Sequence, residues 1–320
     1  MKSTNDAPLS ARNGCNSNLS TRESSACDVI ELNDLLTSRG IDPKKVLVMR
    51  HRPTEPELRK VLPWLAAEKA DVFNAYQQSQ GEKVEKAMLS AVYLASFIGH
   101  EPGKALFIGL YSIGRAKPLT VEEFWKVPAN SKLREFGMNG FTGDDGRSTS
   151  LWFDLSVTEH LASWKGKLIV EWPGLERSWW RWADRNTIAV RAILEDSALD
   201  AAMPEWQRIC LNLQEIGVLP SRWKAALSQW RGIYYIFDTG AGKGYVGSAY
   251  GEENILGRWM NYSATGHGGN SLLRRRNPRE FLFTILQRVS PDMPTDDIIR
   301  LESSWKDRLH TRPPFGWNDN

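Results

Sequence analysis

The spacing of apolar and polar residues separates a polar N-terminal stretch from an ordered body. Residues 1–28 are mostly Ser, Asn, Thr, Ala and Arg. Such a composition buries too little apolar surface to offset the entropy lost when a chain becomes ordered. We therefore expect a disordered tail over residues 1–28, with ordered structure beginning near Val29.

Apolar runs and helical spacing alternate over residues 29–195. The pattern predicts helices over 34–38 and 55–65 and strands over 46–49, 105–112 and 167–172. The stretch 137–150 is rich in glycine and has no periodicity, which indicates a long loop, and loops of that length are usually functional or mobile. We expect residues 29–195 to form a mixed α/β domain.

The remaining chain changes character at Trp230. Upstream, Trp206, Ile209 and Leu213 have helical spacing and Pro220 interrupts it, so residues 196–229 are expected to form a helical linker. The pattern of the last part predicts strands over 231–238, 245–250 and 281–286 and helices over 253–263 and 296–309. A Gly-rich turn joins the first two strands into a hairpin. Residues 230–320 are therefore expected to form an α+β domain with three strands.

Composition narrows the class of protein. Hydrophobic residues make up 41% and charged residues 25% of the chain, which excludes wholesale disorder. The net charge of +3 is too close to zero to indicate a partner by itself. Three scattered Cys exclude a disulfide framework or a zinc site, and we expect one of them, Cys210, in the core. The apolar stretch 87–98 is too short to span a bilayer, and the N-terminus has no apolar signal region, so a soluble, cytoplasmic protein is expected.

A set of spaced residues in the C-terminal part indicates chemistry. Gly232-Ile233-Tyr234 is followed by Tyr245-Val246-Gly247, with the two tyrosines eleven positions apart. Arg258 and Tyr262 then lie four positions apart on the next predicted helix, so they share one side of it. A glycine-rich stretch follows at 266–270, and a helical Glu302 and a near-terminal Asn318 complete the set.

This set resembles the signature of the GIY-YIG nuclease family, and the resemblance covers residues 230–320. It implies a small three-stranded antiparallel sheet flanked by helices, and a catalytic set made of Tyr234, Tyr245, Arg258, Tyr262, Glu302 and Asn318. The chain departs from the family in two places: Val246 replaces an isoleucine, and Ser248 stands where a lysine is often found. Lys243 or an arginine is expected to supply the missing charge.

The residue types suit phosphodiester hydrolysis, which needs an activated water and stabilisation of charge on the phosphoryl oxygens. One carboxylate, Glu302, is the expected ligand of Mg²⁺, for which Mn²⁺ can substitute, because Mg²⁺ takes few protein ligands. Arg258 offers a bidentate guanidinium for the phosphate. Tyr234 is the preferred general base, with Tyr245 as the rival and Tyr262 in an orienting or relay role. We expect Asn318 to position backbone or substrate.

Basic residues around this set are expected to contact DNA phosphates. They are Lys243, His267, Arg274, Arg275, Arg276 and Arg279. The alternative for the arginine run is an ordinary solvated face, and for His267 no role at all.

The strands expected upstream resemble those of the small β-barrel readers of the PUA-like group, which accept flipped bases. Four tryptophans cluster in this region and are candidates for stacking on a base: Trp172, Trp179, Trp180 and Trp182. The alternative is that these rings fill a core.

Together these features predict a metal-dependent DNA endonuclease with an N-terminal target-recognition domain. The composite resembles restriction or phage-defence enzymes, which implies a prokaryotic cytoplasm and double-stranded DNA as partner. A homodimer is one arrangement that would cut both strands. The alternative function is a non-cutting, sequence-specific DNA-binding protein, such as an autoregulator, that retains the nuclease fold.

Overall fold

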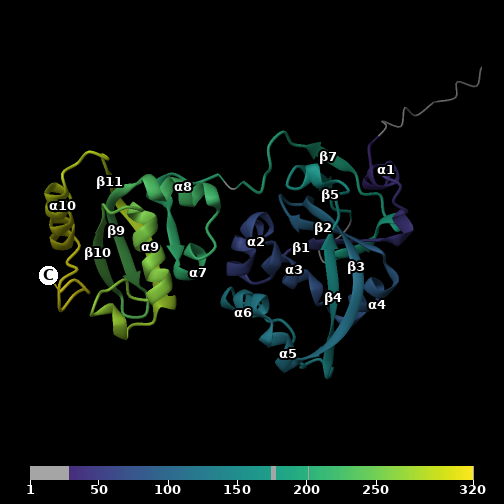
Figure 1. The fold of residues 1–320 in the computed structure, drawn as a ribbon, viewed down its shortest axis with the longest axis horizontal. Helices are drawn as coiled ribbons and strands as arrows, with labels where there is room; N and C mark the ends of the chain where they lie inside the picture. Colours follow the sequence, from purple (N-terminus) through teal and green to yellow (C-terminus); the bar gives the residue numbers. More distant parts are fainter. Residues whose placement is uncertain (1–28, 174–177, 201, 320) are drawn as a thin grey trace, which may run out of the picture.

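A computed structural model describes residues 29–173, 178–200 and 202–319. The tail expected over residues 1–28 lies outside the described residues. Within the described ranges, no helix is both long and apolar enough to cross a membrane. Figure 1 shows two bodies of mixed α and β structure, an N-terminal one and a smaller C-terminal one.

The described N-terminal body is built on a mixed sheet of seven strands in the order β6-β1-β2-β3-β5-β7, with β4 paired to β3. Its strands are β1 (Val46–His51), β2 (Tyr93–Gly99), β3 (Lys104–Thr120), β4 (Thr149–Val157), β5 (Leu168–Glu171), β6 (Trp180–Trp182) and β7 (Val190–Ile193). Only the β1–β2 pair is parallel among these strands, because the helical connection between them returns the chain in the same direction. The PUA-like resemblance implies a small β-barrel. In the described residues the two end strands of the sheet, β6 and β7, are not paired to each other, and the resemblance stays a prediction.

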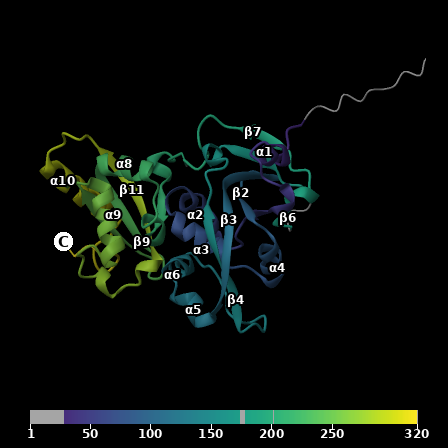
Figure 2. The same ribbon diagram turned by 45° about the vertical axis from the view of Figure 1, so that its right-hand side comes forward.

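Helices cover this sheet on both faces. They are α1 (Leu32–Thr37), α2 (Pro56–Glu68), α3 (Ala70–Gln78), α4 (Glu82–Ser90), α5 (Val121–Lys126) and α6 (Pro128–Glu135). Helix α2 begins at a proline, whose fixed φ suits the first helical position. Figures 1 and 2 show α2, α3 and α6 on the side of the sheet that faces the C-terminal body.

Residues 202–319 form a four-stranded antiparallel sheet in the order β10-β9-β11-β8. Its strands are β8 (Cys210–Asn212), β9 (Arg231–Asp238), β10 (Lys243–Ala249) and β11 (Phe281–Val289), and its helices are α7 (Leu213–Ile216), α8 (Ser221–Gln229), α9 (Asn254–Thr265) and α10 (Thr295–Arg308). Successive side chains of a strand point to opposite faces, so Tyr234 of β9 packs on the α9 side and Ile233 on the α10 side. Each face of the sheet therefore carries one of the two longest helices of this body (Figure 1).

Three expectations for this part are wrong: the sheet of three strands, the wholly helical linker over 196–229 and the place of Cys210 in the core. The sheet has a fourth strand, β8, and that strand lies in the segment expected to be a helical linker. Ile209 and Leu211 are buried while Cys210 between them is exposed, which is the alternation of a strand. The alternation covers only three residues, and the apolar residues around it also have helical spacing, so the sequence pattern did not reveal the strand. The same alternation places the Cys210 side chain outside the core.

The two bodies share a continuous apolar contact between α2 and the segment that leads into β9. The rings of Trp64 and Trp223 lie 5.2 Å apart between centroids. Lys60 Nζ lies 2.7 Å from Glu215 Oε1. At the start of α8, the backbone N–H and the hydroxyl of Ser221 both donate to the Glu68 carboxylate, each at 2.6 Å. An aromatic contact surrounded by polar pairs thus joins the bodies.

Replacing Trp64 by Ala is expected to lower the free energy of unfolding by about 3–5 kcal/mol, because the side chain is 5% exposed and its loss leaves a cavity. Chemical denaturation followed by circular dichroism measures this change. The control is Glu122→Ala, which removes an exposed ion pair with Lys126 and should change stability by less than about 1 kcal/mol. Equal effects of the two substitutions would contradict the packed contact.

Candidate active site

The hairpin of β9 and β10 positions the first tyrosine. Its register places Tyr234 directly opposite Gly247. A Cβ added at Gly247 would lie 2.4 Å from Cζ and from Oη of Tyr234, closer than any real contact. A glycine is therefore required at position 247, because the Tyr234 ring lies directly against its backbone.

Three tyrosine rings meet on this face of the sheet. Tyr234 comes from β9, Tyr245 from β10 and Tyr262 from α9, and the three distances between ring centroids are 6.4, 6.2 and 6.4 Å. Tyr234 and Tyr262 are 0% and 1% exposed, whereas Tyr245 is half-buried. The glycine-rich stretch after α9 closes over this cluster, since a Cβ at Gly268 would lie 2.5 Å from Cζ of Tyr262.

Burial governs the ionisation of these phenols. It raises the pKa of Tyr234, Tyr245 and Tyr262 above the ordinary value, because an apolar surrounding disfavours the charged form. The Arg258 guanidinium opposes this rise at Tyr234, and the same interaction raises the pKa of Arg258. The hydroxyls of Tyr234 and Tyr262 are buried without a hydrogen bond of normal geometry among the described residues. At neutral pH, therefore, all three phenols hold their protons.

Glu302 of α10 lies near this cluster and is itself doubly engaged. Its Oε1 lies 2.7 Å from Nζ of Lys306, one helical turn later, and its Oε2 accepts a hydrogen bond from the Ser248 hydroxyl. The side chains of Glu302 and Lys306 are 16% and 7% exposed, so this ion pair is largely removed from solvent. The carboxylate also acts electrostatically on Tyr234, where it raises the pKa.

Lys306 supplies the positive charge beside Glu302, and the sequence analysis did not single it out. Lys243, expected to supply the charge absent at Ser248, instead donates to the Pro314 carbonyl at 2.6 Å and lies 5.0 Å from the centre of the Trp317 ring. The signal that could have identified Lys306 is its spacing of four from Glu302 on a predicted helix.

The residues present fit a divalent cation that takes few protein ligands. Among the described residues no cluster of three or more His, Cys, Asp or Glu could hold a metal. An ionised carboxylate has about four lone-pair positions, and Lys306 and Ser248 engage two of those of Glu302. The remaining positions suit Mg²⁺, which completes its octahedron with water and phosphate oxygens.

Asn318 holds the backbone of the second tripeptide. Its Oδ1 accepts from the Val246 N–H at 2.9 Å and its Nδ2 donates to the Val246 carbonyl at 2.7 Å. The neighbouring Trp317 N–H donates to the Gly244 carbonyl at 2.9 Å. Of the two roles expected for Asn318, the contacts match the positioning of backbone.

Some of the basic residues expected to contact DNA are bound to other residues of the protein, and others have exposed side chains. Arg276 Nε lies 2.6 Å from Oδ2 of the buried Asp238, and its guanidinium lies 5.2 Å from the Trp317 ring centre. His267 accepts a hydrogen bond at Nδ1 from the Gly269 N–H at 3.0 Å. Three arginines of the same segment have exposed side chains: Arg274, Arg275 and Arg279. These three are the members of the set that present charge at the surface.

The upstream tryptophans do not form one surface. Trp172 is 3% exposed, its Nε1 donates to the Ser178 carbonyl at 2.8 Å, and the guanidinium of Arg50 lies 5.1 Å from its ring centre. Because the ring has almost no exposed area, the expectation that Trp172 reads a base is wrong for this structure. The half-buried rings of Trp179, Trp180 and Trp182 pack against a core cluster that includes residues of β1 and α4, and among these three Trp179 also lines a pocket.

Comparison with solved structures finds a likeness in part of the chain. The catalytic domain of the homing endonuclease I-TevI matches with 29% sequence identity, covering 28% of this chain and 98% of that domain, at a TM-score of 0.24. A mutant of the same catalytic domain matches with 26% identity, covering 28% of this chain and 94% of that one, also at 0.24. No family model and no curated protein matches the chain.

Proposed function

We propose that the chain is a metal-dependent DNA endonuclease of the GIY-YIG type, in which the C-terminal body cuts and the N-terminal body selects the target. One observation carries the proposal: Arg258 of α9 and Glu302 of α10 both act electrostatically on Tyr234 of β9, although the three residues come from separate elements. A phenol, a guanidinium and a carboxylate in one place supply a base, a phosphate ligand and a cation ligand. The motif resemblance of residues 230–320 supports the same reading.

Each residue has a separate task in this proposal. Arg258, exposed on α9, binds the scissile phosphate and stabilises the charge that develops on its oxygens. A tyrosine phenolate takes a proton from the attacking water. Glu302 would hold Mg²⁺ or Mn²⁺, which when bound neutralises charge on the phosphate and the leaving oxygen. Lys306 and Ser248 hold the Glu302 carboxylate in position.

Tyr234 is the proposed base because Arg258 acts on it directly and stabilises its phenolate. Tyr245 is the rival because its half-buried side chain is open to solvent, whereas the Tyr234 hydroxyl is sealed. Tyr262 contacts both rings and is placed to orient them.

The same contacts favour a second candidate function, a DNA-binding protein that does not cut. Both oxygens of Glu302 are engaged and two of the three phenols are sealed, an arrangement that suits a site without turnover. Nicking of supercoiled DNA in Mg²⁺ separates the two candidates. Restriction or phage defence in a prokaryotic cytoplasm is the proposed setting, and digestion of modified and unmodified phage DNA tests it.

Replacing Glu302 by Gln is expected to reduce Mg²⁺-dependent nicking by at least about a hundredfold, since the amide keeps the shape but loses the charge that attracts the cation. DNA affinity in Ca²⁺, measured by mobility shift, should stay close to that of the unmodified protein because arginine and lysine contacts dominate it. The matched control is the exposed Glu252→Gln, which should nick normally. Normal nicking by Glu302→Gln, or undiminished nicking in EDTA, would refute the one-metal site.

The tyrosine assignment predicts a pH profile. Because burial raises the pKa of Tyr234 above its usual value of about 10, the phenolate fraction grows about tenfold per pH unit between about pH 7 and 9. The single-turnover nicking rate should rise with the same slope. Tyr234→Phe should abolish the rise together with the activity. If Tyr245→Phe is inactive while Tyr234→Phe cuts, the base is Tyr245.

Replacing Lys306 by Met is expected to lower the Mg²⁺ concentration for half-maximal nicking by about tenfold. The substitution leaves Glu302 without its 2.7 Å counter-charge, and one unit charge at this range is worth more than the about 1.4 kcal/mol that a tenfold change requires. A Mg²⁺ titration of the nicking rate measures it, with the exposed Lys83→Met as control. An unchanged half-maximal concentration would show that Lys306 does not compete with the cation.

A further inference from the structure

One aromatic side chain of the C-terminal body is turned out to solvent. Phe315 is 73% exposed, the largest exposed fraction among the exposed large hydrophobic side chains of the described residues. Exposure forgoes the free energy that burial of a phenyl ring releases. Single exposed apolar residues are nevertheless common on protein surfaces. What this ring can do therefore depends on how its backbone is held and on which groups lie beside it.

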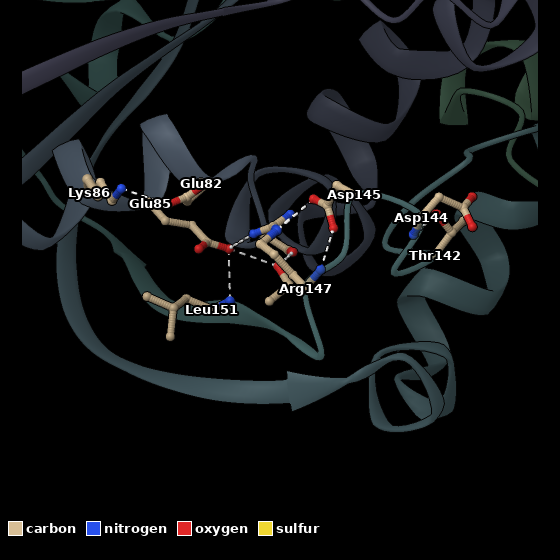
Figure 3. A network of polar contacts seen from close by, with 10 residues as sticks. Glu82, Glu85, Lys86, Thr142, Asp144, Asp145, Arg147 and Leu151 are labelled. Carbon is tan, nitrogen blue, oxygen red and sulfur yellow. Dashed lines mark hydrogen bonds and ion pairs between the residues drawn. The ribbon is translucent and has the colours of Figure 1, made fainter.

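The N-terminal body treats a phenylalanine next to a glycine in the opposite way. Phe141, in the glycine-rich loop 137–150, is 6% exposed, and the Arg147 guanidinium lies 5.3 Å from its ring centre. Figure 3 shows Arg147 between two carboxylates, with Nη1 2.9 Å from Glu85 Oε1 and Nε 2.6 Å from Asp145 Oδ2. A loop of this chain can thus bury its aromatic ring under an anchored arginine, and the segment that carries Phe315 leaves its ring outside.

The backbone around Phe315 forms a tight, fixed turn. The N–H groups of Phe315 and Gly316 both donate to the Arg312 carbonyl, at 3.0 and 3.1 Å. A Cβ at Gly316 would lie 2.2 Å from the Thr311 carbonyl oxygen, so the chain closes on itself here. The Asn318 N–H donates to the same Thr311 carbonyl at 2.8 Å. Because the turn is fixed before any partner binds, ordering of its backbone adds little to the cost of binding.

This turn lies beside the face of the sheet on which the tyrosines meet. Side chains of a strand alternate between its two faces, so Lys243 of β10 shares a face with Tyr245. Lys243 Nζ donates to the carbonyl of Pro314, the residue before Phe315, at 2.6 Å. The exposed ring is therefore next to the strand that supplies Tyr245 to the candidate active site.

The surroundings of the turn carry positive charge. Lys243 Nζ and the Arg276 guanidinium lie 5.0 and 5.2 Å from the ring centre of Trp317, two residues after Phe315. The segment around Arg276 also carries three arginines with exposed side chains: Arg274, Arg275 and Arg279. Exposed cations of this kind attract the phosphates of a nucleic acid backbone.

An apolar ring on a rigid turn beside basic side chains is suited to enter the base stack of a duplex while the cations contact the flanking phosphates. We propose that Phe315 is a wedge that inserts between adjacent base pairs of duplex DNA beside the bond that the C-terminal site cuts. Insertion unstacks and kinks the duplex at that step, and so sets where the backbone lies relative to Arg258. This inference rests on the proposed function, which makes DNA the ligand of this face.

Three substitutions test the wedge. Phe315→Ala removes the ring and Phe315→Leu keeps an apolar wedge. Ile299→Ala is the matched control, because Ile299 is 47% exposed and belongs to α10, which packs on the other face of the sheet. All are made in full-length Glu302→Gln protein so that DNA stays intact. The side chains at both positions are exposed, so the temperature of thermal unfolding should be unchanged.

The first measurement is affinity for random-sequence duplex DNA in Ca²⁺, by mobility shift. Affinity should fall about tenfold in Phe315→Ala and stay close to that of the Glu302→Gln protein in Phe315→Leu and Ile299→Ala. Absence of DNA binding by the Glu302→Gln protein, or an unchanged affinity in Phe315→Ala, would overturn the proposal. A shift from dimer to monomer in Phe315→Ala, measured by sedimentation, would also overturn it, because the ring would then contact a second copy of the chain.

The second measurement separates insertion from contact with the DNA surface. Plasmid DNA is relaxed by a topoisomerase I that needs no Mg²⁺, with each protein at the same occupancy on the DNA. Separation of two stacked base pairs lowers the twist between them, so the linking number should fall with the Glu302→Gln protein and with Phe315→Leu but not with Phe315→Ala. Equal linking numbers with Phe315→Ala and with the Glu302→Gln protein would overturn the proposal.

Nicking by the protein with Glu302 intact is measured in parallel with Mg²⁺. If nicking is absent while the affinity and linking-number results hold, the proposed catalytic function fails and the wedge stands. If nicking is present and the linking numbers are equal, the wedge fails and the catalytic function stands.

Discussion

The contact between the Tyr234 ring and the Gly247 backbone is the constraint on which the C-terminal site depends. A side chain at Gly247 would occupy the volume of the phenol, so the glycine fixes where the ring lies. Tyr245 and Tyr262 then pack around that ring, and Arg258, one turn before Tyr262, lies close enough to act on the phenol electrostatically. Asn318 secures the strand that carries the glycine by two hydrogen bonds to Val246. Packing on one face of a small sheet thus sets the chemistry of the site.

Burial gives that site a resting state. Desolvation holds the phenols in their protonated form, and Lys306 and Ser248 engage the Glu302 carboxylate. A phosphate bound at Arg258 and a cation bound at Glu302 would each bring a charge into the site. These charges would change the pKa of the phenols and compete with Lys306 for the Glu302 carboxylate. Under the proposed function, the site is inactive until DNA and a divalent cation bind together.

The two bodies are joined by packing rather than by a free linker. The Trp64–Trp223 contact and the Glu68–Ser221 hydrogen bonds tie α2 to α8. The site on β9 therefore lies in a body that is in direct contact with the N-terminal body.

Local patterns predicted the elements whose own sequence carries a clear signal. The hairpin of β9 and β10, helix α9 and helix α10 agree with the spacing of their apolar residues, and the tyrosine, arginine and carboxylate of the C-terminal set come together in space. The misses depend on partners distant in sequence. Strand β8 pairs with residues of β11 about seventy positions later, and Trp172 resembles an exposed stacking residue until the fold buries it.

The central proposal is that the C-terminal site hydrolyses a phosphodiester bond of DNA. Arg258 stabilises the charge that develops on the phosphoryl oxygens. The most direct measurement is the single-turnover cleavage rate of Arg258→Ala in Mg²⁺, with DNA affinity determined separately in Ca²⁺. The account predicts a rate lower by about a hundred- to a thousandfold, the usual cost of losing one placed electrostatic donor, with DNA affinity reduced only a little. A cleavage rate equal to that of the unmodified protein would contradict it.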